Sequence, residues 1–187
     1  MIEAELKARV QDPEGLARRL DGLAEGRAEV YRDTYYDTAD KALDGRDAEL
    51  RVRTVEGADG SSRTVLTYKS AAVDEASGSK PEHETEVVDA EQIHAVVRGL
   101  GYVPLIEFSK HCHNYDLTAR GRRMLATVVQ VPEIDGTFIE VETLVEETHM
   151  DDALADVRQV LADLGITDAD LTRELYTDAV RAHREDG

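Results

Sequence analysis

The sequence predicts an α+β protein built around a closed β-sheet whose interior carries charge. Residues 2–10 alternate strictly between apolar side chains (Ile2, Ala4, Leu6, Ala8 and Val10) and charged ones (Glu3, Glu5, Lys7 and Arg9). A period of two places these two sets on opposite faces of one strand. Later strand-like segments repeat the alternation with complementary charges, and segments of helical periodicity lie between them. The repeated charged faces suggest a closed sheet that could hold metal ions and phosphate.

The first half of the chain predicts one helix and four further strands. Asp12 and Pro13 indicate the N-cap and first residue of the helix, and Leu16, Leu20 and Leu23 supply its apolar stripe. Short strands are expected at residues 32–38, 49–55, 64–70 and 82–88, with a turn at 57–60. Residues 71–80 are small and polar, which predicts a mobile loop.

The second half predicts three helices and three strands. One helix begins at Asp89 and ends at Gly101, as expected for an N-cap and a terminal glycine. Paired strands at 105–117 and 123–131 flank a turn at 120–122, and Asp135 with Gly136 signals a hairpin before the last strand, 138–145. Further helices are expected at 151–165, with Asp151 as the cap, and at 168–183. We expect residues 1–187 to form a single domain.

The overall charge excludes some classes of partner. The chain has 40 acidic and 22 basic residues, a formal net charge of −18, which argues against non-specific binding to nucleic acid or an anionic membrane. One cysteine excludes an internal disulfide framework and fits a reducing compartment. With no signal-peptide pattern and no apolar run of membrane-spanning length, we expect a cytoplasmic protein.

The charged strand faces can be read in two ways. They comprise Glu3, Glu5 and Lys7, Arg51 and Arg53, Lys69, Glu84 and Glu86, Lys110, and Glu140 and Glu142. If these faces point outward, the sheet is an ordinary one packed on its helices. If they point inward, the charges must pair with one another or with ligands, because an unpaired buried charge is very costly. Repetition over five or six strands favours the inward arrangement.

An inward arrangement has a clear chemistry. Glutamates are hard oxygen ligands suited to Mg²⁺ or Mn²⁺, and lysines and arginines suit phosphate oxygens. A polyphosphate with bound metal would neutralise both sets. In-line phosphoryl chemistry needs mainly positioning and charge stabilisation, which such a constellation provides.

The ordered motifs make a family resemblance visible. They are E-x-E-x-K at Glu3, Glu5 and Lys7; D-x-Y-[FY]-D-T at residues 33–38; L-R-x-R at 50–53; L-T-Y-K at 66–69; E-x-E at Glu84 and Glu86; G-x-F-x-E-x-E at Gly136, Phe138, Glu140 and Glu142; and an echo of S-Y-x-x-L-L at 175–180. Together they resemble the CYTH superfamily, also called triphosphate tunnel metalloenzymes, in its class IV adenylate cyclase-like (CyaB-like) branch. The set runs nearly end to end, which makes it far more specific than the first motif alone.

The resemblance implies an eight-stranded antiparallel β-barrel tunnel flanked by helices. It implies Glu3, Glu5, Glu140 and Glu142 as ligands of Mg²⁺ or Mn²⁺, and Lys7, Arg51, Arg53, Lys69 and Lys110 as phosphate-binding residues. Glu84 and Glu86 would line the tunnel, and with Lys7 and Tyr36 they form the expected catalytic set. Family activities include cyclisation of ATP and hydrolysis of thiamine triphosphate or tripolyphosphate. The expected partner is such a phosphorylated small molecule, with a homodimer as one option.

Two positions depart from the family pattern. Cys112 stands where a phosphate-binding arginine is expected, and Gln130 stands where an aspartate is expected. A register shift of two could instead supply Arg120, Arg122 or Arg123. These departures favour a specialised substrate.

Several smaller features have competing interpretations. His111, Cys112 and His113 suggest zinc, but alternation turns Cys112 away from both histidines, which favours a small buried thiol over a metal site or a catalytic nucleophile. Tyr35, Tyr36, Tyr68 and Tyr115 could contact a nucleobase or phosphate, or simply pack. Asp33 and Asp37 are expected at a turn or edge.

Three functions follow. The first is a metal-dependent cyclase or phosphohydrolase acting on a triphosphate. The second is a lyase that expels phosphate, with a lysine or tyrosine as base. The third is a non-catalytic binder of nucleotide or polyphosphate.

Overall fold

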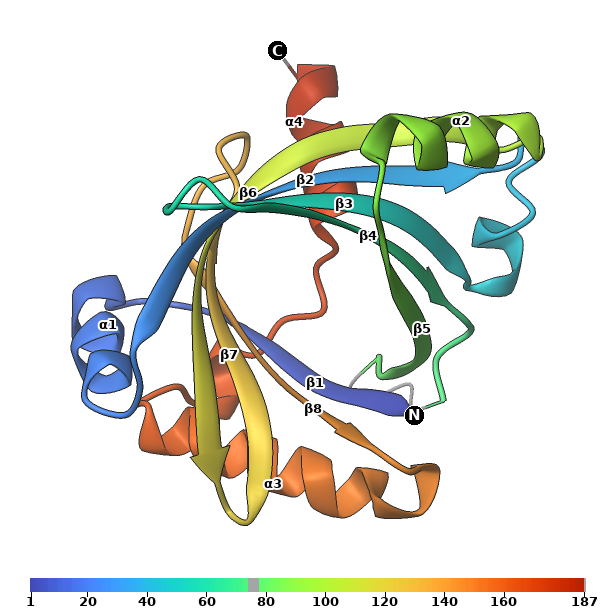
Figure 1. Cartoon of the computed structure of the whole chain (residues 1–187). Coiled ribbons are helices and arrows are strands. Elements are labelled where there is room, and N and C mark those ends of the chain that lie inside the picture. Colours follow the sequence, from blue (N-terminus) through green and yellow to red (C-terminus); the bar gives the residue numbers. More distant parts are fainter. Residues whose placement is uncertain (74–77, 187) are drawn as a thin grey trace.

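Eight strands close into one antiparallel barrel in the computed structural model, which describes residues 1–73 and 78–186. The strands are β1 (Ile2–Arg9), β2 (Gly26–Asp37), β3 (Glu49–Gly57), β4 (Ser62–Lys69), β5 (Lys80–Val87), β6 (Val103–Ala119), β7 (Arg122–Gln130) and β8 (Phe138–Val145). Around the barrel they run β1-β5-β4-β3-β2-β6-β7-β8, as Figure 1 shows. The predicted eight-stranded tunnel is confirmed.

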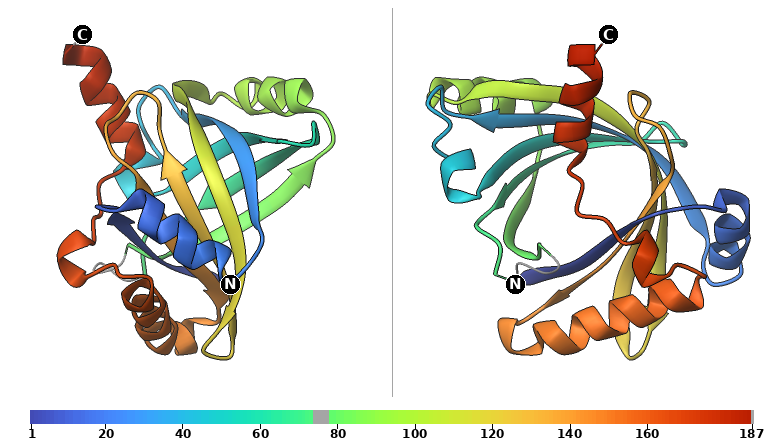
Figure 2. Two further views of the ribbon diagram at one scale, coloured as in Figure 1. Left: turned by 90° about the vertical axis from the view of Figure 1, so that its left-hand side faces the viewer. Right: turned by 180° about the vertical axis from the view of Figure 1, so that it is seen from behind.

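The helices lie outside the barrel (Figures 1 and 2). They are α1 (Pro13–Asp21), α2 (Ala90–Gly99), α3 (Met150–Asp163) and α4 (Tyr176–Asp186), with 3₁₀ turns at Asp44–Arg46, Glu147–His149 and Asp168–Asp170. Asp12 caps α1 as predicted, because its Oδ1 accepts a hydrogen bond from the Gly15 amide at 2.9 Å. None of the helices described is long and apolar enough to cross a membrane.

The main apolar core lies between the barrel wall and the helices. Leu6 and Ala8 of β1 and Ile139 and Val141 of β8 belong to one buried cluster with residues of α1 and α3, including Leu16, Leu20, Val157 and Leu161. Alternation therefore turns the intervening charged side chains of β1 and β8 into the barrel. The apolar faces decide between the two readings of the charged strands, in favour of the inward one.

The barrel closes unevenly around β1. Eight residue pairs join β1 to β8, from Ile2–Val145 to Arg9–Phe138. On its other side β1 pairs with β5 at only two positions, Ile2–Pro81 and Glu3–Lys80. The β1–β5 contact is therefore a narrow seam.

The termini of several elements differ from the sequence prediction. β2 begins at Gly26 rather than at 32, because residues 26–31 continue the pairing with β6 as far as Tyr115. Helix α3 begins at Met150, so Asp151 lies in its first turn and is not its cap. Of the predicted loop 71–80, residues 74–77 lie outside the described part of the chain.

The predicted helix over 168–183 is wrong in its first half. Residues 168–170 form a 3₁₀ turn, and the helix begins only at Tyr176. The intervening residues 171–175, which we call the C-terminal strap, run along β1: Leu171 forms a bridge with Ala8, and the Thr172 amide donates to the Lys7 carbonyl at 2.9 Å. Backbone pairing with β1 replaces the helical hydrogen bonds here.

Candidate functional site

A cavity of about 1100 Å³ lies inside the barrel and is lined mainly by charged side chains. These include Glu3, Glu5 and Lys7 of β1, Arg51 and Arg53 of β3, Lys69 of β4, Glu82 and Glu84 of β5, Lys110 of β6, and Glu140 and Glu142 of β8. All five residues predicted to hold phosphate, and all four predicted to hold metal, line this one space.

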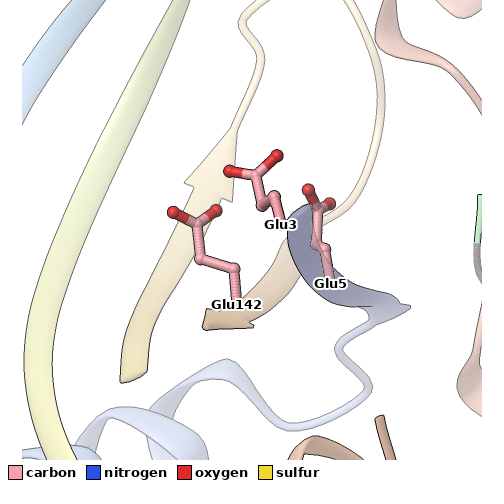
Figure 3. A group of neighbouring side chains, drawn as sticks. All are labelled: Glu3, Glu5 and Glu142. Carbon is pink, nitrogen blue, oxygen red and sulfur yellow. The ribbon is translucent and has the colours of Figure 1, made fainter. Parts of the chain in front are cut away.

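Three carboxylates form a cluster at one side of the cavity (Figure 3). Glu3, Glu5 and Glu142 each offer an oxygen, and these atoms lie within 4.8 Å of one another. The cause is register, because Glu5 pairs directly with Glu142 and Glu3 lies two residues along the same face of β1. Glu140 lies opposite Lys7 in the same ladder and lines the cavity outside this cluster.

Simultaneous ionisation of all three carboxylates is unfavourable in this cluster. Burial, followed by the charges of Glu140 and Glu3, raises the pKa of Glu5 to about 7. Burial, Glu3 and Glu5 likewise raise the pKa of Glu142 well above its usual value. Crowded carboxylates with raised pKa values are what a divalent cation with hard oxygen ligands would relieve. The donor set therefore fits Mg²⁺ or Mn²⁺.

Lys69 lies between this cluster and the strand β5. Its ammonium contacts the Glu3 carboxylate and lies 2.9 Å from a Glu82 oxygen. Burial alone would lower the pKa of Lys69, but Glu3, Glu5 and Glu82 raise it well above its usual value. The side chain is therefore a fixed positive charge beside the carboxylates.

A second group of charges centres on Asp33. The Asp33 carboxylate accepts two hydrogen bonds from Arg53, at 2.6 and 2.7 Å, and lies 3.6 Å from the Lys110 ammonium. Burial would raise the pKa of Asp33, but Arg53 and then Lys110 hold it well below its usual value. The expectation of a turn or edge position is wrong for Asp33, which is 1% exposed inside the barrel. It holds for Asp37, whose carboxylate accepts from the Thr38, Leu43 and Asp44 amides.

Arg51 is buried, and part of its guanidinium lacks a hydrogen-bond partner among the residues that the structure describes. Its Nη2 lies 3.4 Å from Thr67 Oγ1, and its Nε has no hydrogen-bond partner within the described part of the chain. No carboxylate of the described residues comes within 4.0 Å of its guanidinium. A buried guanidinium with an open donor is costly unless an anion completes it. Arg51 is thus the cation of the cavity best placed to take a phosphate oxygen.

The expected catalytic set is only partly brought together. Lys7 and Glu84 line the cavity, and Glu84 accepts a hydrogen bond from Thr67 at 3.0 Å. Glu86 is exposed farther along β5, opposite Val65, and is not among the residues that line the cavity. Because residues i and i+2 of a strand share a face, Glu86 lies on the same face of β5 as Glu84, and its expected place in the tunnel wall stays a prediction.

Tyr36 faces away from the cavity, so its predicted catalytic role is wrong. It packs with Val52 and Val97 beneath α2, and its hydroxyl lies 2.6 Å from His94 Nδ1. Its neighbour Tyr35 faces inward and stacks on Phe108, with ring centroids 5.7 Å apart. Adjacent strand residues point to opposite faces, so only one of the two tyrosines can reach the tunnel.

Two other tyrosines also lie away from the cavity. The Tyr68 ring stacks on His83, with ring centroids 6.4 Å apart. The Tyr115 hydroxyl donates to Asp21 at 3.0 Å beneath α1. Of the four tyrosines considered from the sequence, Tyr35 alone lines the cavity.

The two departures from the family pattern have different outcomes. Cys112 does line the cavity, next to Lys110 on the same face of β6. Gln130 is exposed at the end of β7, where its Nε2 donates to Thr137 Oγ1 at 3.1 Å. The substitutes do not replace a cavity cation: Arg120 and Arg122 pair with Asp163 and Asp156 of α3. Arg123 is exposed and is not a lining residue of the cavity.

Cys112 is expected to resist alkylation. Burial raises the pKa of its thiol to about 12, so the reactive thiolate is scarce at neutral pH. We expect iodoacetamide at pH 7 to modify the folded protein at least tenfold more slowly than the urea-unfolded protein, as mass spectrometry would show. Equal rates would point instead to an accessible thiolate and would support a catalytic role for the thiol.

The zinc hypothesis gains no support from the structure. His111 and His113 are exposed, and the described residues hold no metal-ligand cluster that includes Cys112.

Tyr176 is a cavity residue that sequence reasoning missed. Its ring lies 4.4 Å from the Lys7 ammonium and 4.6 Å from that of Lys110, measured to the ring centroid. Burial, followed by the adjacent Glu140 carboxylate, raises the pKa of its phenol. The only sequence signal was the motif echo at 175–180, because the position of the strap depends on its tertiary path.

Known proteins share this architecture over nearly their whole lengths. A relative from Methanocaldococcus jannaschii, "Putative adenylate cyclase MJ0240", is 24% identical over 179 residues, which are 94% of this chain and 97% of the relative. The structure of PH1819 protein from Pyrococcus horikoshii OT3 gives a TM-score of 0.82 at 26% identity, covering 97% of this chain and 99% of the other. HpAC1 from Hippeastrum, described as an adenylyl cyclase candidate that reveals a dominant triphosphatase activity, gives 0.64 at 19% identity, covering 97% and 95%.

The family assignment rests on a match that agrees with the geometry above. Residues 1–176 match the CYTH domain, a span that contains all eight strands and the charged cavity. The protein therefore belongs to the CYTH family.

Proposed function

We propose that the protein is a divalent-metal-dependent phosphohydrolase that acts on a triphosphate inside the barrel. One observation carries this proposal. The Glu3–Glu5–Glu142 cluster lines the same cavity as several buried cations, among them Arg51, whose Nε is unpaired among the described residues. The names of similar proteins are consistent with this: one is named "Putative adenylate cyclase MJ0240", HpAC1 is described as having a dominant triphosphatase activity, and both activities use a triphosphate.

The carboxylate cluster would hold the metal. Glu3, Glu5 and Glu142 present hard oxygen donors to one point, with Glu140 close by. CYTH proteins are generally dependent on divalent metals. Bound there, the metal would act as a Lewis acid toward phosphoryl oxygens.

The basic residues would bind and orient the phosphates. Arg51 offers an open donor, while Asp33 fixes Arg53 and Lys110 in place. Charges that the fold holds in place inside a protein stabilise developing negative charge more strongly than charges in water, and need no reorganisation during the reaction. Positioning and charge stabilisation are the main requirements of phosphoryl transfer.

Hydrolysis is favoured over cyclisation by how the tyrosines are used. Each tyrosine that lines the cavity already has a ring contact: Tyr31 with Arg53 at 4.4 Å, Tyr35 with Phe108, and Tyr176 with two lysines. These contacts leave the aromatic rings engaged with the protein rather than free to stack on a nucleobase. Recognition of the phosphates themselves, with water as nucleophile, is the simpler use of such a cavity.

Four of the lysines and tyrosines that line the cavity are poorly suited to be the base that the lyase alternative needs. A general base works best with a pKa near the working pH. Burial lowers the pKa of Lys69 and Lys110, but nearby carboxylates and, for Lys110, Tyr35 raise it above the usual value in both cases. Burial raises the pKa of Tyr35 and of Tyr31. None of these four groups is therefore suited to remove a proton near neutral pH.

A product assay tests the proposal. The protein is incubated with tripolyphosphate, ATP or thiamine triphosphate, with Mg²⁺ or Mn²⁺, and the products are resolved by mass. We expect metal-dependent release of orthophosphate. Its rate should fall about 100-fold or more in Arg51→Ala, because the variant loses a buried cation that would stabilise the charge of the transition state. Tyr36→Phe serves as the control and should retain activity, because Tyr36 lies outside the cavity.

The other outcomes separate the alternatives. Cyclic AMP with pyrophosphate would assign a cyclase. Tight binding without turnover of any triphosphate would favour the non-catalytic binder. Turnover that is unaffected by both Arg51→Ala and Glu3→Gln would place the chemistry outside this cavity.

A further inference from the structure

One aromatic ring joins two of the residues expected to hold phosphate. Lys7 comes from β1 and Lys110 from β6, and their ammonium groups lie 4.4 and 4.6 Å from the centroid of the Tyr176 ring. We propose that Tyr176 is a positioning residue that holds Lys7 and Lys110 together in the cavity, charged and ready for adjacent phosphate oxygens. This inference rests on the proposed function and assigns a role there to the C-terminal segment.

The C-terminal strap fixes where the ring lies. Figure 2 (right) shows the segment between α3 and α4 crossing one end of the barrel. Thr172 donates to the Lys7 carbonyl at 2.9 Å, Arg9 pairs with Glu174 at 2.5 Å, and the Lys7 ammonium donates to the Glu174 carbonyl. The strap therefore contacts residues 7–9 of β1, and the first of these is Lys7 itself.

The ring itself is held from two further directions. Tyr176 is 6% exposed and meets Phe138 edge to face, with ring centroids 5.3 Å apart and planes at 84°. Helix α4, which begins at Tyr176, is anchored by Arg184, which binds the Glu133 carboxylate at 2.6 and 2.8 Å and the Glu107 carbonyl at 2.7 Å. A ring fixed on both sides is a stable platform for the lysines.

An aromatic platform holds a lysine without cancelling its charge. Lys7 lies opposite Glu140 in the β1–β8 ladder, yet no carboxylate oxygen of the described residues is within 4.0 Å of its ammonium. The ring attracts the ammonium through its quadrupole and carries no net charge. A carboxylate partner would hold the lysine too, but would neutralise it. Without the ring, we expect Lys7 to turn toward Glu140 or Glu5 and to be lost as a phosphate ligand.

Lys110 is likewise held by the Tyr176 ring without being fully neutralised by a carboxylate. Its ammonium is 3.6 Å from Asp33, which Arg53 already occupies through two hydrogen bonds. The Asp33 charge is therefore shared, and the Tyr176 ring supplies the remaining contact. Two cations then lie against one ring while keeping donors free.

The test is tripolyphosphate binding to the full-length protein, measured by calorimetry without metal, with KM and kcat measured separately with metal. Tyr176→Leu should weaken binding about tenfold or more and raise KM more than it lowers kcat, because two cation–π contacts are lost. Tyr176→Phe keeps the ring and should stay within about twofold of the wild type. Val180→Ala, at a fully buried site of α4 away from the lysines, controls for loosened packing and should bind normally.

Each contrary outcome has one meaning. If the wild type binds tripolyphosphate and Tyr176→Leu binds equally well, the positioning role is overturned while the proposed function stands. If Tyr176→Phe is as weak as Tyr176→Leu, the hydroxyl matters rather than the ring, and the role is overturned. If Val180→Ala weakens binding as much as Tyr176→Leu, helix docking explains the loss. If the wild type fails to bind, the proposed function fails and takes this inference with it.

Discussion

Glu5→Gln is expected to lower metal-dependent turnover by about 10²–10³-fold, because it removes one of the three carboxylates that we propose hold the metal. The same change should raise the stability of the metal-free protein. Burial and neighbouring charge raise the pKa of Glu5 to about 7, so its ionised form is disfavoured in the fold. Replacing it with a neutral amide should add up to about 3–4 kcal/mol to the free energy of unfolding at pH 8.

The sign of the pH dependence follows from this raised pKa. Ionised Glu5 destabilises the metal-free fold above its unfolded pKa of roughly 4.3. The penalty grows as the pH rises toward about 7 and is constant above that. Glu5→Gln should therefore lose this part of the pH dependence.

Urea unfolding with and without Mn²⁺ measures both effects. The wild type should gain stability from Mn²⁺, as any protein does whose folded state alone binds the ligand, and Glu5→Gln should gain much less. Glu14→Gln, whose side chain is 91% exposed on α1, is the matched control and should behave as the wild type. Equal stabilisation by Mn²⁺ in Glu5→Gln and the wild type would show that the metal binds elsewhere.

Asp33→Ala is expected to destabilise the protein by about 3–5 kcal/mol, because it leaves Arg53 and Lys110 buried without their shared carboxylate. Burial would raise the pKa of Asp33, but these cations hold it low, so its contribution is present above pH ~4 and is lost as the pH falls further. Tripolyphosphate should restore part of the loss, because its oxygens can replace the missing anion.

Urea unfolding at pH 7 measures this loss as well. Asp116→Ala removes one partner of an exposed ion pair with Arg27 and should cost about 0–1 kcal/mol. A loss below about 1 kcal/mol in Asp33→Ala would show that water or another group compensates the two cations. Failure of tripolyphosphate to stabilise the variant would place its binding site away from Arg53 and Lys110.

The sequence could identify the charged faces, and their repetition over several strands favoured an inward direction, but no single strand shows by its residue pattern which way its charges point. Glu3, Glu5 and Lys7 alternate equally well on an inner or an outer face. The direction is set by long-range packing, in which Leu6 and Ala8 meet α1 and α3. The family resemblance, which spans the chain, supplied the direction that local periodicity could not.

The errors at the site have identifiable physical causes. Tyr36 was one residue out of phase, and alternation from Asp33, which pairs with Arg53 inside the barrel, would have selected Tyr35 instead. Asp33 looked like an edge residue because its two cations come from strands far away in the sequence. Tyr176 could not be placed because the strap that carries it is extended where the sequence pattern predicts helix.

The placement of β1 links the site to the order in which the chain assembles. β1 is the first strand of the sequence, yet its long partner is β8, whose residues pair with it from 129 to 143 positions later. Pairs so distant in sequence form late and slowly, since a very large loop must close first. Glu5 and Glu142 are one of these pairs. Before β8 pairs with β1, the two residue pairs with β5 stabilise β1 only weakly. In a nascent or truncated chain that lacks β8, the cluster of Glu3, Glu5 and Glu142 is therefore incomplete, and it is complete only when the barrel closes.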